Sequence, residues 1–199
     1  MSVTVVGYDP SMGRWQPGAR GRLLQAALEL YGEHGYERTT VAEIAARAGL
    51  TERTFFRHFA DKREVLFAGN DILNGVIVEA VAATPAETAP IDVAAAGMRA
   101  AAAMIQEGGD LPRRRAAIIA PSVELQEREL IKLASMTALL AEQLRGRGIA
   151  EPAASLAAEA AVAAFKTGFA RWLEDEPGRD LRQRIDESLD ELRAVAAGS

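Results

Sequence analysis

The sequence predicts an all-α fold of about nine helices, in which a small N-terminal helical domain precedes a larger one. The chain has 199 residues, of which 40 are alanine, the residue that favours helices most. Aromatic residues, which suit strands, make up only 6%. Apolar residues also recur at helical spacing, and the first such stripe consists of Leu23, Ala26, Ala27, Leu30 and Tyr31.

Composition excludes several classes of protein. The chain has no cysteine, which excludes disulfides, cysteine–zinc sites, iron–sulfur clusters and thiol nucleophiles. With 49% hydrophobic and 26% charged residues it is typical of a folded chain. The first residues lack a basic segment followed by a long apolar one, and no uninterrupted apolar run approaches roughly 18 residues. We therefore expect a cytoplasmic protein with no signal peptide and no membrane contact.

Charge is unevenly distributed along the chain. Residues 1–65 hold 9 basic and 8 acidic residues, whereas the remainder holds 14 basic and 20 acidic residues. A basic-leaning head on an acidic body weakly favours a polyanionic partner at the head, although uneven solvated charge explains it equally well. The triplet Arg113–Arg115 is interpreted as a solvated face.

Glycines, prolines and capping residues divide the chain into elements. Residues 1–16 show no clean period and are expected to form a flexible arm. The helices are predicted over residues 17–35, 40–49, 52–58, 62–83, 91–107, 112–121, 122–145, 151–174 and 180–197.

Capping signals are clearest between residues 40 and 64. Thr40 followed by Glu43 is a capping box, and Thr51 is expected to cap the helix that starts at residue 52. Asp61 and Glu64 read as a second capping box, which predicts a continuous helix over residues 62–83.

The two short helices within residues 40–58 predict a helix-turn-helix unit. Ala45 has to be small because the two helices cross there, and Gly49 has to adopt a positive φ, which costs little only for glycine. Leu50 and Phe55 are expected to fill the angle between the helices. Such a unit projects its second helix outward, at a width that fits the major groove of DNA.

The stretch 39–67, TTVAEIAARAGLTERTFFRHFADKREVLF, resembles the DNA-binding segment of the TetR/AcrR family of bacterial transcriptional regulators. The Thr-x-x-x-Ile-Ala start, the Ala-Gly-x-Thr turn, the Thr-Phe-Phe-x-His-Phe core and the following Asp-Lys all fall in register. The resemblance covers residues 17–67, and the remaining two thirds match only in layout. It implies a DNA-binding domain over residues 17–66 and an effector-binding and dimerisation domain over residues 67–199.

The predicted recognition helix offers several DNA contacts. Arg53 is placed for a bidentate contact to guanine. The resemblance implies phosphate contacts for Thr40, His58 and Lys62, and the start of a helix suits Thr51 to the same role. Two departures from the family change the operator sequence: Phe56 stands where Tyr is usual, and Arg57 where an aromatic residue is common. The predicted DNA-binding residues are Thr40, Thr51, Glu52, Arg53, Thr54, Phe56, Arg57, His58 and Lys62.

The larger domain is expected to hold an effector pocket and a dimer interface. In similar proteins the pocket lies among the middle helices, and the candidates here are Phe67, Met98, Met104, Met136, Leu140, Phe165 and Phe169. The family pairs its last two long helices across a twofold axis. The dimer candidates are Ala157, Ala161, Ala164, Gly168, Ile185, Leu189 and Leu192. Ordinary packing within one chain explains the same small-residue edge.

The function that the resemblance implies is a ligand-responsive regulator, a repressor that binds a palindromic operator as a homodimer. A small hydrophobic or amphipathic effector of this regulator would release it from double-stranded DNA. The alternatives are a helical small-molecule-binding enzyme and a non-specific DNA-binding protein. Walker A, His-Glu-x-x-His, Gly-x-Ser-x-Gly and Rossmann patterns are absent from the sequence. The acidic body opposes non-specific DNA binding, which depends on positive charge. We expect no enzyme activity, no cofactor and no metal.

Overall fold

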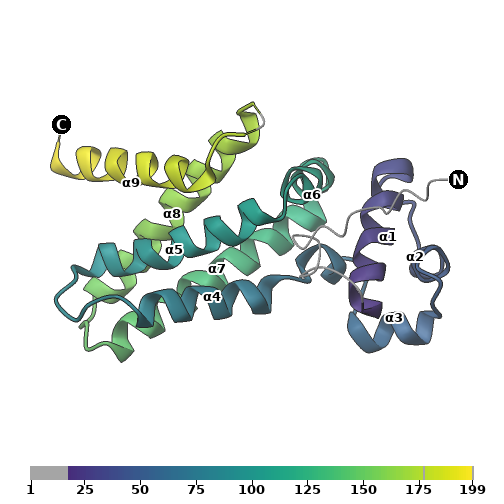
Figure 1. The fold of residues 1–199 in the computed structure, drawn as a ribbon, viewed down its shortest axis with the longest axis horizontal. Coiled ribbons are helices and arrows are strands. Elements are labelled where there is room, and N and C mark those ends of the chain that lie inside the picture. Colours follow the sequence, from purple (N-terminus) through teal and green to yellow (C-terminus); the bar gives the residue numbers. More distant parts are fainter. Residues whose placement is uncertain (1–17, 177, 199) are drawn as a thin grey trace, which may run out of the picture. The chain divides into compact units, whose positions relative to one another are not determined.

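The computed structural model describes residues 18–176 and 178–198, and the predicted arm over residues 1–16 lies outside this part. In the described residues the chain forms nine α-helices, one 3-10 helix (η2) and no strand, which confirms the all-α fold (Figure 1). The elements are α1 (Ala19–His34), α2 (Val41–Arg47), α3 (Glu52–His58), η2 (Glu64–Phe67), α4 (Asn70–Ala82), α5 (Pro90–Glu107), α6 (Leu111–Ile119), α7 (Val123–Gly146), α8 (Ala153–Glu174) and α9 (Leu181–Ala197).

The chain divides into two compact units after Ala68, two residues beyond the predicted domain boundary. The N-terminal unit contains α1, α2, α3 and η2. Its core is built from the predicted stripe of α1 and from one to three residues of each later element. Leu23, Ile44, Phe55 and Val65 are all completely buried in it. Because α2 and α3 are only seven residues long, this shared core, rather than their own hydrogen bonds, has to hold them in place.

The turn between α2 and α3 has the predicted construction. The Thr40 side chain accepts from the N–H of Glu43, and the Glu43 carboxylate accepts from the N–H of Thr40, which completes the capping box. Gly49 has a φ of 65°, where other residues are strained. The N–H of Leu50 then donates to the carbonyl of Ala45 at 2.8 Å.

The predicted continuous helix over residues 62–83 is wrong, because the chain breaks it at residues 68–69. Asp61 accepts from the backbone N–H groups of Arg63 and Glu64, as the capping signal indicates. The turn that it caps is the short 3-10 helix η2, and α4 begins only at Asn70. Taken together, residues 64–82 are long and apolar enough to cross a membrane. They do not form one continuous α-helix, and Glu64, Asp71 and Glu79 lie among them, so length and composition alone carry little weight here.

The C-terminal unit is a bundle of α4 to α9. Helices α4, α5 and α7 run side by side, α8 packs against α5 and α7, and α9 lies across α8 and α5 (Figure 1). One buried cluster of residues from α4, α5, α7, α8 and α9 fills the space between them. Met98, Leu140, Ala161 and Ile185 are each 0% exposed in this cluster. The alanine-rich helices therefore pack at short distances around a continuous core.

Hydrogen bonds and an ion pair hold the short α6 to its neighbours. The interpretation of Arg113–Arg115 as a solvated face is therefore wrong for two of the three residues. Arg113 donates to the carbonyls of Trp172 and Leu173, both at 2.6 Å, and lies 4.2 Å from the centre of the Trp172 ring. Arg115 is partly buried and pairs with Glu129 at 2.9 Å. Two of these arginines therefore bond to neighbouring groups of the fold, and only Arg114 is exposed.

Candidate DNA-binding interface

Helix α3 presents one face to solvent and one to the core. Phe55 is completely buried, whereas Glu52, Arg53, Phe56 and Arg57 are exposed. Within the described residues neither Arg53 nor Arg57 has an ion-pair partner. Two cationic side chains without ion-pair partners therefore share the exposed face of α3 with an aromatic ring, a combination suited to phosphates and base edges.

The hydroxyl groups near the start of α3 already form hydrogen bonds within the helix turn. The Thr51 side chain accepts from the N–H of Thr54 at 3.2 Å, and the two threonine hydroxyls lie 3.1 Å apart. Thr51 is exposed and Thr54 is partly buried. The pair fixes the first turn of α3. The DNA contacts of both residues remain predictions, and in such a contact each hydroxyl group would also take part in this hydrogen bond.

Thr40 is held in the same way at the start of α2. Its hydroxyl donates to the Glu43 carboxylate at 2.8 Å while accepting from the Glu43 N–H. The hydrogen bonds from the backbone and side chain of Thr40 lower the pKa of the Glu43 carboxyl group. A phosphate near Thr40 would therefore meet a carboxylate that stays ionised.

His58 lies at the end of α3 and is half-buried. Its Nε2 atom is buried and has no hydrogen-bond partner in the described part of the chain. A phosphate contact of His58 would have to use the other ring nitrogen, Nδ1.

Lys62 has a role within the fold that the sequence pattern did not reveal. Its ammonium group donates to the carbonyls of Tyr36, Glu37 and Thr39 at 2.8, 3.2 and 3.0 Å, and it lies 4.3 Å from the centre of the Tyr36 ring. The Tyr31 hydroxyl in turn donates to the Lys62 carbonyl at 2.7 Å. Lys62 thus ties the segment after α3 to the segment after α1, and its phosphate contact remains a prediction.

Five of the seven predicted effector residues lie in or against one buried cluster. Met98, Met136, Leu140 and Phe165 belong to the buried cluster of the C-terminal unit, and Phe169 packs against it. The rings of Phe165 and Phe169 stack at 6.0 Å between centroids. Met104 is only partly buried, and Phe67 is 4% exposed and belongs to the N-terminal unit.

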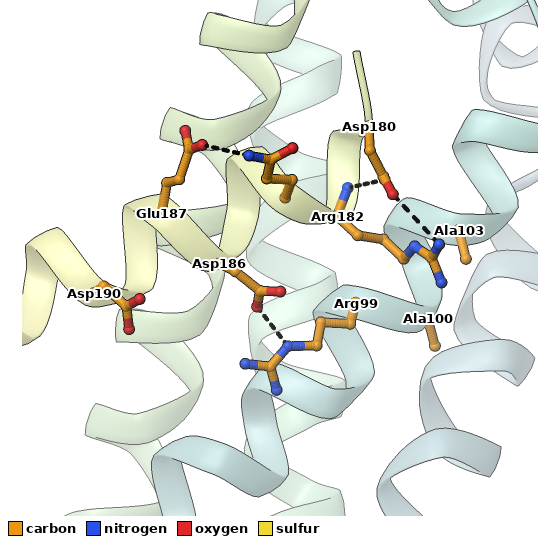
Figure 2. Close-up of a pocket in the computed structure, with 9 residues that line it drawn as sticks. Arg99, Ala100, Ala103, Asp180, Arg182, Asp186, Glu187 and Asp190 are labelled. Atoms are coloured by element: carbon orange, nitrogen blue, oxygen red, sulfur yellow. Dashed lines mark hydrogen bonds and ion pairs between the residues drawn. The ribbon is translucent and has the colours of Figure 1, made fainter. Parts of the chain in front are cut away.

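A groove of about 550 Å³ lies between α5 and α9, away from these residues (Figure 2). It is lined mainly by charged side chains that bond to one another. Arg99 donates to Asp186 at 2.5 Å, and the N–H of Arg182 donates to Asp180 at 2.9 Å. None of the seven candidate effector residues lines this groove.

The predicted dimer residues lie inside the protomer. Apart from the partly buried Leu192, each is less than 9% exposed in the single protomer. At Gly168 the backbone of α9 is so close that a Cβ atom would lie 2.8 Å from the Arg184 carbonyl oxygen. The small-residue edge of α8 therefore serves packing within the chain, as the alternative interpretation held. The exposed face of α8 holds Leu156, Ala163, Thr167 and Ala170, with the charged Glu159 and Lys166 beside them.

Comparison with known proteins agrees with the geometry of α2 and α3. Residues 23–68 match the family of bacterial regulatory proteins called the tetR family, and residues 88–197 match the MftR C-terminal domain. TcmR, an HTH-type transcriptional regulator of Streptomyces glaucescens, is 36% identical over 89 residues, which cover 45% of this chain and 39% of TcmR. The HTH-type transcriptional repressor KstR2 of Mycobacterium tuberculosis is 36% identical over 58 residues, or 29% of this chain and 28% of KstR2.

A solved structure extends the similarity to most of the chain. FadR of Thermus thermophilus, a TetR-family transcriptional repressor solved in complex with lauroyl-CoA, aligns with a TM-score of 0.58 and 25% identity. The alignment covers 87% of this chain and 93% of FadR, whereas the chain spans less than half the length of the curated relatives named above. These relatives are transcriptional regulators and not enzymes. The chain belongs to the TetR family of DNA-binding transcriptional regulators.

Proposed function

We propose that the chain is a repressor that binds a palindromic operator as a homodimer and leaves it when a small amphipathic molecule binds. The observation that carries the proposal is the solvent-exposed face of α3, which presents Arg53, Phe56 and Arg57 while Phe55 anchors the helix in the core. Such a face is suited to the major groove. Two copies related by a twofold axis would read two half-sites about 34–36 Å apart.

The dimer is proposed to use the exposed stripe of α8 instead of the buried small-residue edge. Leu156, Ala163, Thr167 and Ala170 recur at helical spacing, and Leu156 exposes 64% of its surface. On α9, Val195 is 75% exposed. Glu159 and Lys166 are exposed beside these residues, so the surface is a narrow apolar stripe bordered by charge. Its small side chains allow close approach of a second helix, and homodimers usually bury such surfaces across a twofold axis.

The effector is proposed to be amphipathic. Methionine adapts to varied apolar shapes, and Met98 and Met136 lie in the same buried cluster as Phe165. The related repressor FadR was solved with lauroyl-CoA, a molecule with an apolar chain and a polar head. Binding at this cluster would have to displace its packing. We propose that this displacement tilts α4, which directly follows the N-terminal unit in the chain, and changes the spacing of the two α3 helices. An effector can shift the equilibrium only by its differential affinity for the two forms.

The test starts with selection of duplexes from a random pool by the full chain. Bound duplexes are then titrated by fluorescence anisotropy, with native mass measurement of the complex. We expect a palindromic consensus, two protomers per duplex, and release by lauroyl-CoA but not by coenzyme A alone. A strictly monomeric complex contradicts the dimer. If lauroyl-CoA and a panel of other amphipaths bind without antagonising DNA, the release mechanism is wrong.

A further inference from the structure

Phe56 is an aromatic side chain that the fold leaves in solvent. It exposes 55% of its surface and is the one aromatic residue among the exposed large apolar residues of the described chain. Exposure of a large ring is unfavourable for an isolated protein. Phe56 lies on α3, the helix that faces DNA under the proposed function, so DNA is the partner that would cover the ring.

The local geometry fixes where the ring points. At 100° per residue, Phe56 lies about 40° from Glu52 and about 60° from Arg53 around the helix. It therefore occupies the exposed arc between them. From behind, the ring packs against the buried Phe55, with centroids 5.4 Å apart and an interplanar angle of 81°. The ring is supported by the core on one side and free on the other, so little freedom is left to lose on contact.

The chemistry of the groove selects what this ring can touch. A phenylalanine has no hydrogen-bonding group, so it cannot bond a phosphate oxygen or a polar base edge. In the major groove the apolar group that differs between bases is the 5-methyl group of thymine. Resting on the proposed function, we infer that Phe56 reads a thymine in each operator half-site through that methyl group, while the adjacent arginines contact guanine or phosphate.

The experiment removes the methyl group and nothing else. Each thymine of the selected duplex is replaced in turn by deoxyuridine, and the dissociation constant of the full chain is measured by anisotropy. At one thymine in each half-site we expect a loss of about fourfold, the size expected when one methyl group leaves an apolar contact. For Phe56→Ala the same replacement is expected to make no difference.

Two variants separate this effect from a general loss of binding. Phe56→Tyr keeps the ring and should keep the thymine-to-uracil ratio. Arg57→Ala should weaken binding to every duplex but leave that ratio unchanged. Circular dichroism melting checks that all three variants are folded. The inference is overturned if no thymine of the wild-type complex responds to deoxyuridine, or if the response persists in Phe56→Ala. If selection yields no duplex at all, the proposed function fails first and the inference falls with it.

Discussion

Gly168 of α8 lies directly against the backbone of Arg184 in α9: a Cβ atom on Gly168 would come within 2.8 Å of the Arg184 carbonyl oxygen and 2.9 Å of its carbonyl carbon. No side chain fits between the two helices at this point. Because the obstacle is backbone and not the end of a flexible side chain, relief requires the helices to move apart.

Gly168→Ala is therefore expected to destabilise the protein by about 1–3 kcal/mol, the usual cost of overpacking, despite the better helix propensity of alanine. Chemical denaturation of the purified chain measures this. Gly75 is the matched control, because it lies inside α4 with no atom within 4 Å of a built Cβ. Gly75→Ala should stabilise by about 0.5–1 kcal/mol. Equal effects at both sites would mean that the α8–α9 contact is looser than described.

Substitution of Arg113 tests the tie between α6 and α8. Arg113→Met keeps the apolar stem but removes two hydrogen bonds to the last carbonyls of α8 and the contact with the Trp172 ring. We expect a loss of about 2 kcal/mol, since hydrogen bonds to charged groups are among the stronger ones. The neighbouring Arg114 is exposed, and Arg114→Met should stay within about 0.5 kcal/mol of wild type. If the denaturation curves of the two variants overlay, the hydrogen bonds of Arg113 to α8 do not stabilise the fold.

Lys62→Met tests whether Lys62 is a structural or a DNA-contacting residue. Since its ammonium donates to three carbonyls, the variant should lose about 2 kcal/mol of stability. The slope of binding affinity against salt distinguishes the two roles, because each phosphate contact adds about one unit to it. If the predicted phosphate contact forms, the slope for the folded variant should be lower than that of wild type by about one unit. An equal slope would leave Lys62 with its structural role alone.

The ion pair of Asp175 and Arg184 predicts a pH dependence of stability. Arg184 donates to both carboxylate oxygens at 2.6 and 2.5 Å, which lowers the pKa of Asp175. A carboxyl group with a lowered pKa stabilises the fold fully above its unfolded value of about 3.9, and this stabilisation is lost as the pH falls through the folded pKa. Urea midpoints between pH 2 and 7 should fall below about pH 4. Asp175→Asn should be less stable at neutral pH and show a shallower acid loss. Parallel curves would rule out this pair as a source of the acid sensitivity.

A pair of leucines tests the proposed dimer surface. Leu156 on α8 and Leu130 on α7 expose 64% and 57% of their surfaces, so an arginine at either site costs little within the protomer. Leu156→Arg is expected to produce monomers in sedimentation measurements, because a charge would be buried in the proposed interface. Leu130→Arg should leave the assembly unchanged. The opposite pattern would place the interface on α7.

The short helices of the N-terminal unit could be predicted from sequence almost to the residue. Their signals are local: the Thr40–Glu43 capping box, the glycine at position 49 and the Thr51 cap each act within four residues. The break before α4 could not be predicted in this way. Asp61 does cap a turn, as its position predicts. Whether that turn continues as a helix depends on how Val65 and Leu66 pack in the core, and the helical spacing of apolar residues carries no information about that packing.

The faces of α8 show a second limit of the sequence pattern. Alanine and glycine recur at helical spacing on both the inner edge, which holds Ala161 and Gly168, and the outer stripe, which holds Ala163 and Ala170. Only the structure shows which of them α9 covers. Arg113 was missed for a related reason, since an arginine in a charged run gives no sign of the distant carbonyls it will bond.

The half-buried position of Lys62 has a consequence for how this regulator responds to ionic strength. Mobile ions screen Arg53 and Arg57, which stand in solvent, more effectively than an ammonium enclosed by three carbonyls and a tyrosine ring. Rising salt should therefore dissociate the protein from nucleic acid well before it destabilises the N-terminal unit. Dissociation and unfolding become separate events, and a regulator freed by salt stays competent to bind again on dilution.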